Sequence, residues 1–272
     1  MTIFLFKGFF VLQIILFSVI GLAHIGRGEP SGRRITVVFN NISDAVQLQT
    51  GWGFSCVVEG FGRTILFDTG CDGKMLISNM EHLGINPASI DMIILSHMHA
   101  DHTGGLEHFL RQNHKVTVVL PRSFGHSFVQ QIKYLGADVL VVSEPTQLLD
   151  GVYSTGEMGD QIKEQALILE TSKGLVIITG CAHPGLVNIV KLAGQYLKKN
   201  VYLTMGGFHL MGLNALQVRE CLQTLKALHV KKVAPSHCTG EAAIASFRQS
   251  WGEDFLAGGC GAVIEVDGSL SP

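Results

Sequence analysis

Three histidines and an aspartate occupy six consecutive positions at the end of the apolar run IDMIILS, residues 90–96. Such a continuous apolar run is typical of a strand that is covered on both faces of its sheet. The segment that follows, LSHMHADHTGG at 95–105, then forms the loop at the carboxyl end of this strand, and Gly104 and Gly105 allow a tight turn toward the next helix. The chain must therefore fold so that a covered strand ends at a cluster of titratable side chains.

The spacing within this loop is typical of metal ligands. His97 and His99 are two residues apart, so their rings point to the same side of an extended segment, and Asp101 and His102 follow in the turn. Imidazole and carboxylate groups together suit zinc or iron better than calcium or magnesium, which prefer oxygen ligands. We therefore expect one or two zinc ions here, with iron or manganese as alternatives.

Three further histidines stand at the ends of other apolar, β-rich runs. They are His183 in TGCAHPG, His209 in GGFHL and His237 in APSHC. Because strand ends that meet at one edge of a sheet are where such folds build binding sites, these histidines are candidates for the same site. A surface loop with unrelated histidines is the alternative, and this recurrence argues against it.

Strands alternate with helices along the chain, but hairpins interrupt a pure strand–helix–strand pattern. FSCVVEG (54–60) and RTILFDTG (63–70) predict one such hairpin. The two halves have the same layout, and 47% of the residues are hydrophobic while only 15% are charged, which favours a large buried core. These features predict an α+β fold in which two sheets form a sandwich with helices outside.

The first thirty residues differ from the rest. Lys7 precedes an uncharged stretch from Gly8 to Gly26, which fits either a signal peptide with a cleavage site at Gly21–Ala23 or an uncleaved transmembrane anchor. Residues 1–30 are thus expected to be a leader with a linker, the folded domain to span 35–268, and the protein to be exported or membrane-anchored, on the secreted or periplasmic side. The formal net charge of −2 gives no reason to expect nucleic acid as a partner.

The motifs resemble those of a known family. SHMHADHTGG resembles the HxHxDH signature of the metallo-β-lactamase superfamily, ILFDTG resembles its first motif, and the resemblance runs from about Ile35 to about Val266. It implies a four-layer αββα sandwich with a metal site, commonly of zinc, at one edge.

The resemblance also implies roles for individual residues. His97 and His99 match ligands of a first metal, Asp101 and His102 match ligands of a second, and His237 matches the late histidine of that second site. Asp68 in FDTG matches a carboxylate that orients a ligand. His183 is our candidate for the third ligand of the first metal.

The sequence departs from the family pattern in TGCAHPG. Cys181 stands where many members have the aspartate that bridges the two metals. It either bridges as a thiolate or is an inert small residue beside the site, and the usual behaviour of free cysteine favours the inert interpretation. Cys238 is interpreted as a neighbour of His237.

Within the superfamily, GWGFS, HTGGL, GCAHPG, GGFHL and SHCTG resemble the group named for 7,8-dihydropterin-6-methyl-4-(ribofuranosyl)aminobenzene-phosphate synthase. The resemblance implies that His209 lies near the metals and contacts substrate.

We expect a metal-dependent hydrolase that uses a metal-bound hydroxide on a small ester, lactone or phosphoester, with Asp101 and His209 as catalytic residues. A pterin-pathway transferase and a non-catalytic exported protein that binds metal or ligand are the alternatives.

Overall fold

The structure is a computed structural model and describes residues 32–267. The leader and linker expected over residues 1–30 lie outside this part of the chain. Among residues 32–267, no helix is both long enough and apolar enough to cross a membrane.

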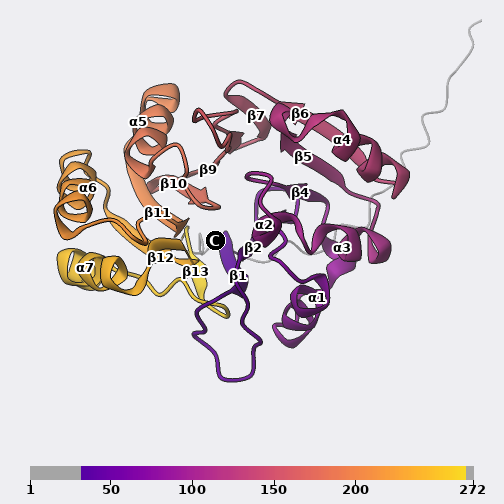
Figure 1. Cartoon of the computed structure of the whole chain (residues 1–272), viewed down its shortest axis with the longest axis horizontal. Helices are drawn as coiled ribbons and strands as arrows, with labels where there is room; N and C mark the ends of the chain where they lie inside the picture. Colours follow the sequence, from indigo (N-terminus) through magenta and orange to yellow (C-terminus); the bar gives the residue numbers. More distant parts are fainter. Residues whose placement is uncertain (1–31, 268–272) are drawn as a thin grey trace, which may run out of the picture.

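Two mixed sheets form the centre of the molecule (Figure 1). The strands of the first sheet are β1 (Arg34–Asn40), β2 (Phe54–Glu59), β3 (Ile65–Phe67), β4 (Met92–Ile94), β5 (Thr117–Pro121), β6 (Asp138–Val142) and β13 (Val263–Glu265). They are arranged in the order β13-β1-β2-β3-β4-β5-β6. The strands of the second sheet are β7 (Thr146–Leu149), β8 (Val152–Ser154), β9 (Leu167–Thr171), β10 (Gly174–Thr179), β11 (Val201–Gly207) and β12 (Lys232–Ser236), in the order β12-β11-β10-β9-β8-β7.

Helices cover the outer face of each sheet (Figure 1). In the first half of the chain these are α1 (Gly73–His82), α3 (Leu106–Gln112) and α4 (Gly125–Tyr134), while the short helix α2 (Ala100–Thr103) lies beside β2. Those in the second half are α5 (Leu186–Leu197), α6 (Ala215–Ala227) and α7 (Glu241–Trp251). Short 3-10 turns are η1 (Pro87–Ser89), η2 (Arg122–Phe124), η3 (His237–Thr239) and η4 (Gly252–Asp254).

Three clusters of buried side chains hold these layers together. One lies between the sheets and joins residues such as Val37 and Phe67 of the first sheet to Ile178 and Met205 of the second. A second cluster packs the first sheet against α1, α3 and α4, and a third packs the second sheet against α5, α6 and α7. The four-layer αββα sandwich predicted from the sequence is therefore confirmed.

The parallel strands direct the motif residues to one edge. Strands β3, β4 and β5 are parallel to one another, as are β10, β11 and β12. The carboxyl ends of these strands lead into the segments that carry Asp68, His97, Cys181, His209 and His237. Side chains that are far apart in the sequence meet there for this reason.

Several elements differ from the sequence-based expectations. The run IDMIILS forms only three residues of strand, Met92–Ile94: the N–H of Leu95 still donates to Val119 of β5, but the N–H of Ser96 donates to the carboxylate of Asp68 and the ladder ends. The predicted turn at 100–103 is the short helix α2. Strands β7 and β8 and helix α7 were not predicted; β7 is a half-exposed edge strand, TQLL, that lacks an alternating pattern.

Candidate metal centre

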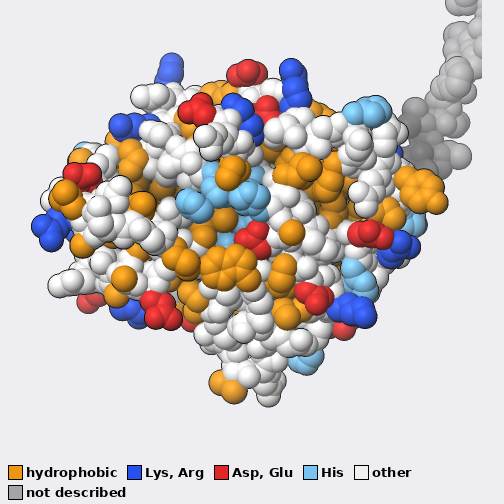
Figure 2. All heavy atoms as spheres, in the orientation of Figure 1, with side chains coloured by type: hydrophobic (Ala, Val, Ile, Leu, Met, Phe, Trp, Pro, Cys, Tyr) orange, Lys and Arg blue, Asp and Glu red, His pale blue; other side chains and the backbone are white. Residues whose placement is uncertain are grey.

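The histidine side chains gather in the middle of one face, surrounded by hydrophobic side chains (Figure 2). The His97 ring centroid lies 4.6 Å from that of His99 and 4.8 Å from that of His183. The centroids of His99 and His183 are 4.9 Å apart. The structure thus brings together the three residues predicted as ligands of a first metal.

A second group lies directly beside the first. The Nε2 atoms of His102 and His237 lie 3.5 Å and 3.4 Å from Oδ2 of Asp101. Ligand atoms of Asp101, His102, His237 and Cys181 all lie within 4.8 Å of one another, close enough for them to share one ion. All six residues predicted as metal ligands are therefore found in one place, in the two predicted groups.

Asp68 fixes the orientation of His102. Its carboxylate is fully buried and accepts the Nδ1–H of His102 at 2.7 Å. It also accepts the backbone N–H and the hydroxyl of Ser96, each at 2.7 Å. Because Asp68 holds the proton on Nδ1 of His102, Nε2 is the ring nitrogen that faces the site, and it offers a metal its lone pair when it carries no proton.

Ser96 orients His97 in a similar way. The single hydroxyl proton of Ser96 goes to Asp68, so its oxygen accepts the Nδ1–H of His97 at 2.9 Å. This leaves Nε2 of His97 free, and it lies 3.1 Å from Nδ1 of His99. One buried carboxylate therefore sets the ring tautomer of a histidine in each group.

Two ring nitrogens in the site are buried without a hydrogen-bond partner. Nδ1 of His237 donates to the side-chain oxygen of Asn41 at 2.8 Å, and its Nε2 has no partner. Nε2 of His183 is also unpartnered. Buried polar atoms normally have partners, and a metal ion accepts lone pairs of this kind, so these residues fit a metal centre.

The electrostatics also fit a cation. Burial lowers the pKa of His102, but the charges of Asp68 and Asp101 outweigh this effect and raise it to about 10. Burial and the neighbouring histidines lower the pKa of His97 far below its usual value. In the absence of a metal, His102 thus holds a second proton on Nε2, and a metal ion that binds this nitrogen takes the place of that proton.

Four non-glycine residues at the site have left-handed backbone conformations. Asp68, Ala182, His209 and His237 have φ angles of 55°, 60°, 51° and 44°. Such conformations are unfavourable for most residues and collect at functional sites, where the surrounding structure enforces them. The strand-end loops are therefore held in the shape that directs these side chains inward.

Glu164 was not identified from the sequence. Its fully buried carboxylate accepts the backbone N–H groups of Cys181, Ala182 and His183, at 3.0, 2.9 and 2.8 Å. It therefore anchors the loop that carries two residues of the site. An acidic residue just before the apolar run QALILE is the one sequence signal that could have indicated it.

Asn41 and Trp52 were also missed. The Trp52 ring is 47% exposed and its centroid lies 4.9 Å from that of His237. The sequence carries no signal for these contacts with His237, because the contacts of Asn41 and Trp52 depend on how distant parts of the chain meet in the fold.

The site residues differ in solvent exposure, and the exposed ones mark the side of the site that is open to solvent. His97, His102 and His237 are buried, Asp101 and His183 are half-buried, and His99 and His209 are exposed. The ring centroid of His209 lies 4.3 Å from that of His183. The structure thus places the predicted catalytic residue His209 on the rim of the site, where a substrate can reach it.

Two cysteines lie at the centre of the site. Sγ of Cys181 lies 3.2 Å from Nε2 of His102, and the thiol of Cys238 donates to the backbone oxygen of Cys181 at 3.6 Å. Neither cysteine forms a disulfide.

Gly104 and Gly105 serve close packing rather than a tight turn. Both have ordinary helical φ angles, −63° and −79°. A Cβ atom on Gly105 would lie 2.2 Å from the backbone oxygen of Thr69, and one on Gly104 would lie 2.6 Å from that of Cys71. The histidine loop can therefore approach the FDTG loop only with glycine at these positions.

Comparisons with known proteins agree with this geometry. Residues 53–189 match the profile of the metallo-beta-lactamase superfamily. A 7,8-dihydropterin-6-methyl-4-(beta-D-ribofuranosyl)-aminobenzene-5'-phosphate synthase of Methanocaldococcus jannaschii is 34% identical over 254 residues, which cover 76% of this chain and 86% of that protein.

Solved structures show the same fold. A metal-dependent hydrolase of the beta-lactamase superfamily superimposes with a TM-score of 0.76 at 25% identity, covering 87% of this chain and all of that one. The short form of human tRNase Z has a TM-score of 0.59 at 14% identity, covering 86% of this chain and 99% of the other. This chain belongs to the metallo-beta-lactamase superfamily and is an enzyme of that superfamily.

Proposed function

We propose that this enzyme joins a pterin to an aromatic amine in a metal-dependent displacement. The pterin would carry a diphosphate leaving group on its 6-methyl carbon. The amine nitrogen would form a bond to that carbon while the carbon–oxygen bond to diphosphate breaks, and the amine proton would leave to a base of the site. We thus favour a transferase over a hydrolase of esters, lactones or phosphoesters.

The observation that carries the proposal is the similarity to the Methanocaldococcus synthase. The aligned region covers 86% of that relative at 34% identity. The name of the relative describes a product that contains a dihydropterin, an aminobenzene and a ribofuranosyl 5'-phosphate. The motifs GWGFS and SHCTG, among others, show the same resemblance at the level of the sequence.

The metal would be held by two groups of residues. His97, His99 and His183 form one group, and Asp101, His102 and His237 form the other. A metal ion bound there supplies Lewis acidity, which polarises phosphate oxygens and stabilises the charge of a departing diphosphate.

Asp101 and His209 would manage the protons. Asp101 is half-buried, and despite burial the neighbouring imidazoles of His102 and His237, 3.5 and 3.4 Å from its Oδ2, hold its pKa far below its usual value. Its carboxylate therefore stays ionised and can accept a hydrogen bond from the nucleophile and orient it. A hydrogen bond with Cys238 raises the pKa of His209, so this exposed ring can donate to the leaving oxygen.

Hydrophobic side chains at the rim suit an aromatic substrate. Trp52 is 47% exposed, and Met98 and Met211 are 50% and 54% exposed. Met98 lies between two site histidines in the chain, and Met211 follows His209 by two residues. A flat pterin ring can stack on the indole of Trp52 beside the metal groups.

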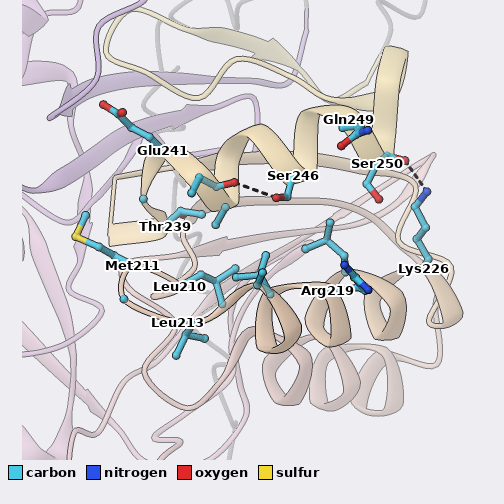
Figure 3. Close-up of a pocket in the computed structure, with 17 residues that line it drawn as sticks. Leu210, Met211, Leu213, Arg219, Lys226, Thr239, Glu241, Ser246, Gln249 and Ser250 are labelled. Carbon is cyan, nitrogen blue, oxygen red and sulfur yellow. Dashed lines mark hydrogen bonds between the residues drawn. The ribbon is translucent and has the colours of Figure 1, made fainter.

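A cavity of about 690 Å³ adjoins these loops (Figure 3). It lies between α6 and α7, and its lining includes Leu210, the residue after His209, and Thr239, which ends the turn η3 that begins at His237. Arg219 lines it farther along. We assign this cavity to the anionic arm of the amine substrate, because an arginine is the side chain best suited to bind a phosphate.

Hydrolysis is the second candidate function. The metal-dependent hydrolase with a TM-score of 0.76 is 25% identical to this chain. The same residues would then act on a water molecule in place of the amine. The two candidates differ in the nucleophile and in the group that it attacks, so an assay that offers both kinds of substrate separates them.

The test uses the full chain loaded with zinc. It is incubated with a dihydropterin 6-methyl diphosphate, with and without 4-(ribofuranosyl)aminobenzene 5'-phosphate, and separately with phosphodiesters and lactones. Mass spectrometry follows the coupled product, and a colorimetric assay follows diphosphate. We expect the coupled product only in the complete mixture.

His97→Ala should abolish coupling, whereas His126→Ala, at an exposed histidine of α4, should leave it unchanged. Arg219→Gln should raise the KM for the phosphorylated amine and leave kcat nearly unchanged. Turnover of a phosphodiester or lactone without any coupling would contradict the transferase and support hydrolysis.

An exported or membrane-anchored location also stays a proposal. It is supported by the uncharged stretch from Gly8 to Gly26, and membrane fractionation of cells that express the full chain tests it. Recovery of the intact chain in the cytosol would contradict it.

A further inference from the structure

Cys181 belongs to every group of potential metal ligands in the described part of the chain. Its Sγ lies with His97 and His183, with Asp101, His102 and His237, and with His209 and Cys238. We propose that the thiolate of Cys181 is a metal ligand shared by the first two groups, in the position where many members of the superfamily have an aspartate. This inference rests on the proposed metal-dependent function.

The distances are those expected of atoms that bind one ion. Zn–S and Zn–N bonds of about 2.3 and 2.0 Å at a tetrahedral angle place sulfur and nitrogen about 3.5 Å apart. Sγ of Cys181 lies 3.2 Å from Nε2 of His102, the ring nitrogen that faces the site because Nδ1 donates to Asp68. A thiol–imidazole contact of this length needs only a small adjustment to hold a metal.

Two independent observations point to a ligand on either side of the sulfur. The unpartnered Nε2 atoms are those of His183, in the first group, and His237, in the second. His237 is buried, with 1% of its surface exposed. Each of these nitrogens can bind a metal, and Sγ of Cys181 lies within 4.8 Å of the ligand atoms of both groups, so one thiolate can reach a metal in either group.

The backbone around Cys181 is fixed. Its N–H donates to Glu164 at 3.0 Å, and the next residue, Ala182, is held at a φ of 60°. Only 3% of the surface of Cys181 is exposed. A buried thiolate requires a positive partner, and a metal supplies one when the thiol proton leaves to solvent.

Cys238 contacts the backbone of Cys181. Its thiol donates to the backbone oxygen of Cys181, and it shares a group only with Cys181 and His209. Gly207 admits it, because a Cβ there would lie 2.8 Å from Sγ of Cys238. Cys238 is therefore a positioning residue and not a ligand of the two main groups.

A sulfur ligand changes which metals the site prefers. Thiolates favour zinc, cobalt and iron, whereas carboxylates suit manganese and magnesium. The wild type, with its thiolate, should thus bind manganese more weakly than the Cys181→Asp variant, which restores the carboxylate of the family pattern.

Cobalt binding tests the inference without relying on activity. The full-length protein is titrated with Co²⁺, and the near-ultraviolet charge-transfer absorption of a cobalt–thiolate bond is recorded together with the cobalt content. We expect the wild type to show this absorption and Cys181→Ser and Cys181→Asp to lack it while still binding cobalt. Cys238→Ser and Cys221→Ser, the latter at a half-buried cysteine of α6, should retain it.

X-ray absorption of the zinc-loaded wild type gives a second measurement that needs no variant. A sulfur shell at about 2.3 Å supports the inference, and a shell of nitrogen and oxygen alone overturns it. A cobalt-loaded wild type without the charge-transfer absorption, or a Cys181→Ser variant that keeps it, also overturns it. A protein that shows the sulfur bond but turns over no substrate would refute the proposed function and leave this inference standing.

Discussion

Asp68→Asn is the most informative single substitution, because it removes one charge and leaves the shape of the side chain. The backbone should accept it, since Asp68 has a φ of 55° and asparagine tolerates the left-handed region well. The buried carboxylate accepts three hydrogen bonds of 2.7 Å, from the Nδ1 of His102 and from the N–H and hydroxyl of Ser96.

An amide cannot accept all three. If its NH₂ group faces His102, it meets a ring N–H, and the imidazole proton must move to Nε2, the nitrogen that faces Cys181 and Asp101. If it faces Ser96 N–H instead, a buried donor loses its acceptor, at a cost of about 1–3 kcal/mol. In the first orientation the metal loses a ligand lone pair.

We expect zinc affinity to fall by about 10–100-fold, which is the usual effect of losing a group that orients a ligand. This corresponds to about 1.4–2.8 kcal/mol of binding free energy. Competition with a chromophoric chelator measures the affinity. Asp72→Asn is the matched control, because Asp72 caps α1 in the same part of the chain and asparagine caps a helix equally well. Zinc affinity of Asp68→Asn within threefold of the wild type would refute this reasoning.

Four further predictions follow from the same geometry. Glu164→Gln must turn an NH₂ group toward at least one of three backbone N–H donors, so it should weaken zinc binding about 10-fold or more. Glu107→Gln, at an exposed residue of α3, is the control and should leave zinc binding unchanged. Equal losses of zinc affinity in both variants would contradict the anchoring role of Glu164. Burial raises the pKa of Glu164 from its usual value of 4.5 to about 7, despite the backbone N–H groups that lower it. The wild type therefore loses stability as the pH rises from the unfolded pKa of 4.5 to the folded pKa of about 7, because only the unfolded chain gives up the proton in this interval. Urea titrations should show Glu164→Gln gaining stability relative to the wild type between about pH 4.5 and pH 7, and a constant difference over this interval would count against it. Gly105→Ala should lower the free energy of unfolding by about 1–3 kcal/mol, because its Cβ would lie 2.2 Å from a backbone oxygen. Gly84→Asn should have a smaller effect, because the space beside Gly84 is open. Calorimetry that ranks the two variants in the opposite order would be evidence against the close approach at Gly105. Zinc at 100 times its Kd should add about 2.7 kcal/mol to the free energy of unfolding, an amount that a chelator removes, and an unfolding midpoint indifferent to zinc would contradict the site.

The sequence predicts the architecture well because its signals are local. Apolar runs such as GLVIITG (174–180) and helix signals such as the capping box that Asn214 and Gln217 form in the structure each depend on few neighbours. The resemblance supplied how the sheets combine, and the histidine positions at strand ends predicted where the ligands converge.

The supporting residues could not be predicted in this way. Glu164, Ser96 and Asn41 act through contacts across loops, and Asn41 and His237 are 196 residues apart. The interpretation of Cys181 as inert followed from the ordinary behaviour of cysteine, and only the folded chain shows its sulfur between two unpartnered histidine nitrogens. Short strands such as β7 and β8 were missed because a strand of three or four residues is too short to show a distinctive period.

The metal content of the purified full chain tests the central claim most directly. Elemental analysis after purification without added metal, followed by titration with zinc, should give one or two equivalents per chain in the wild type. His97→Ala should bind less, and His126→Ala should match the wild type. A wild-type protein that folds but retains no transition metal, and that binds zinc no more tightly than His97→Ala does, would contradict the account.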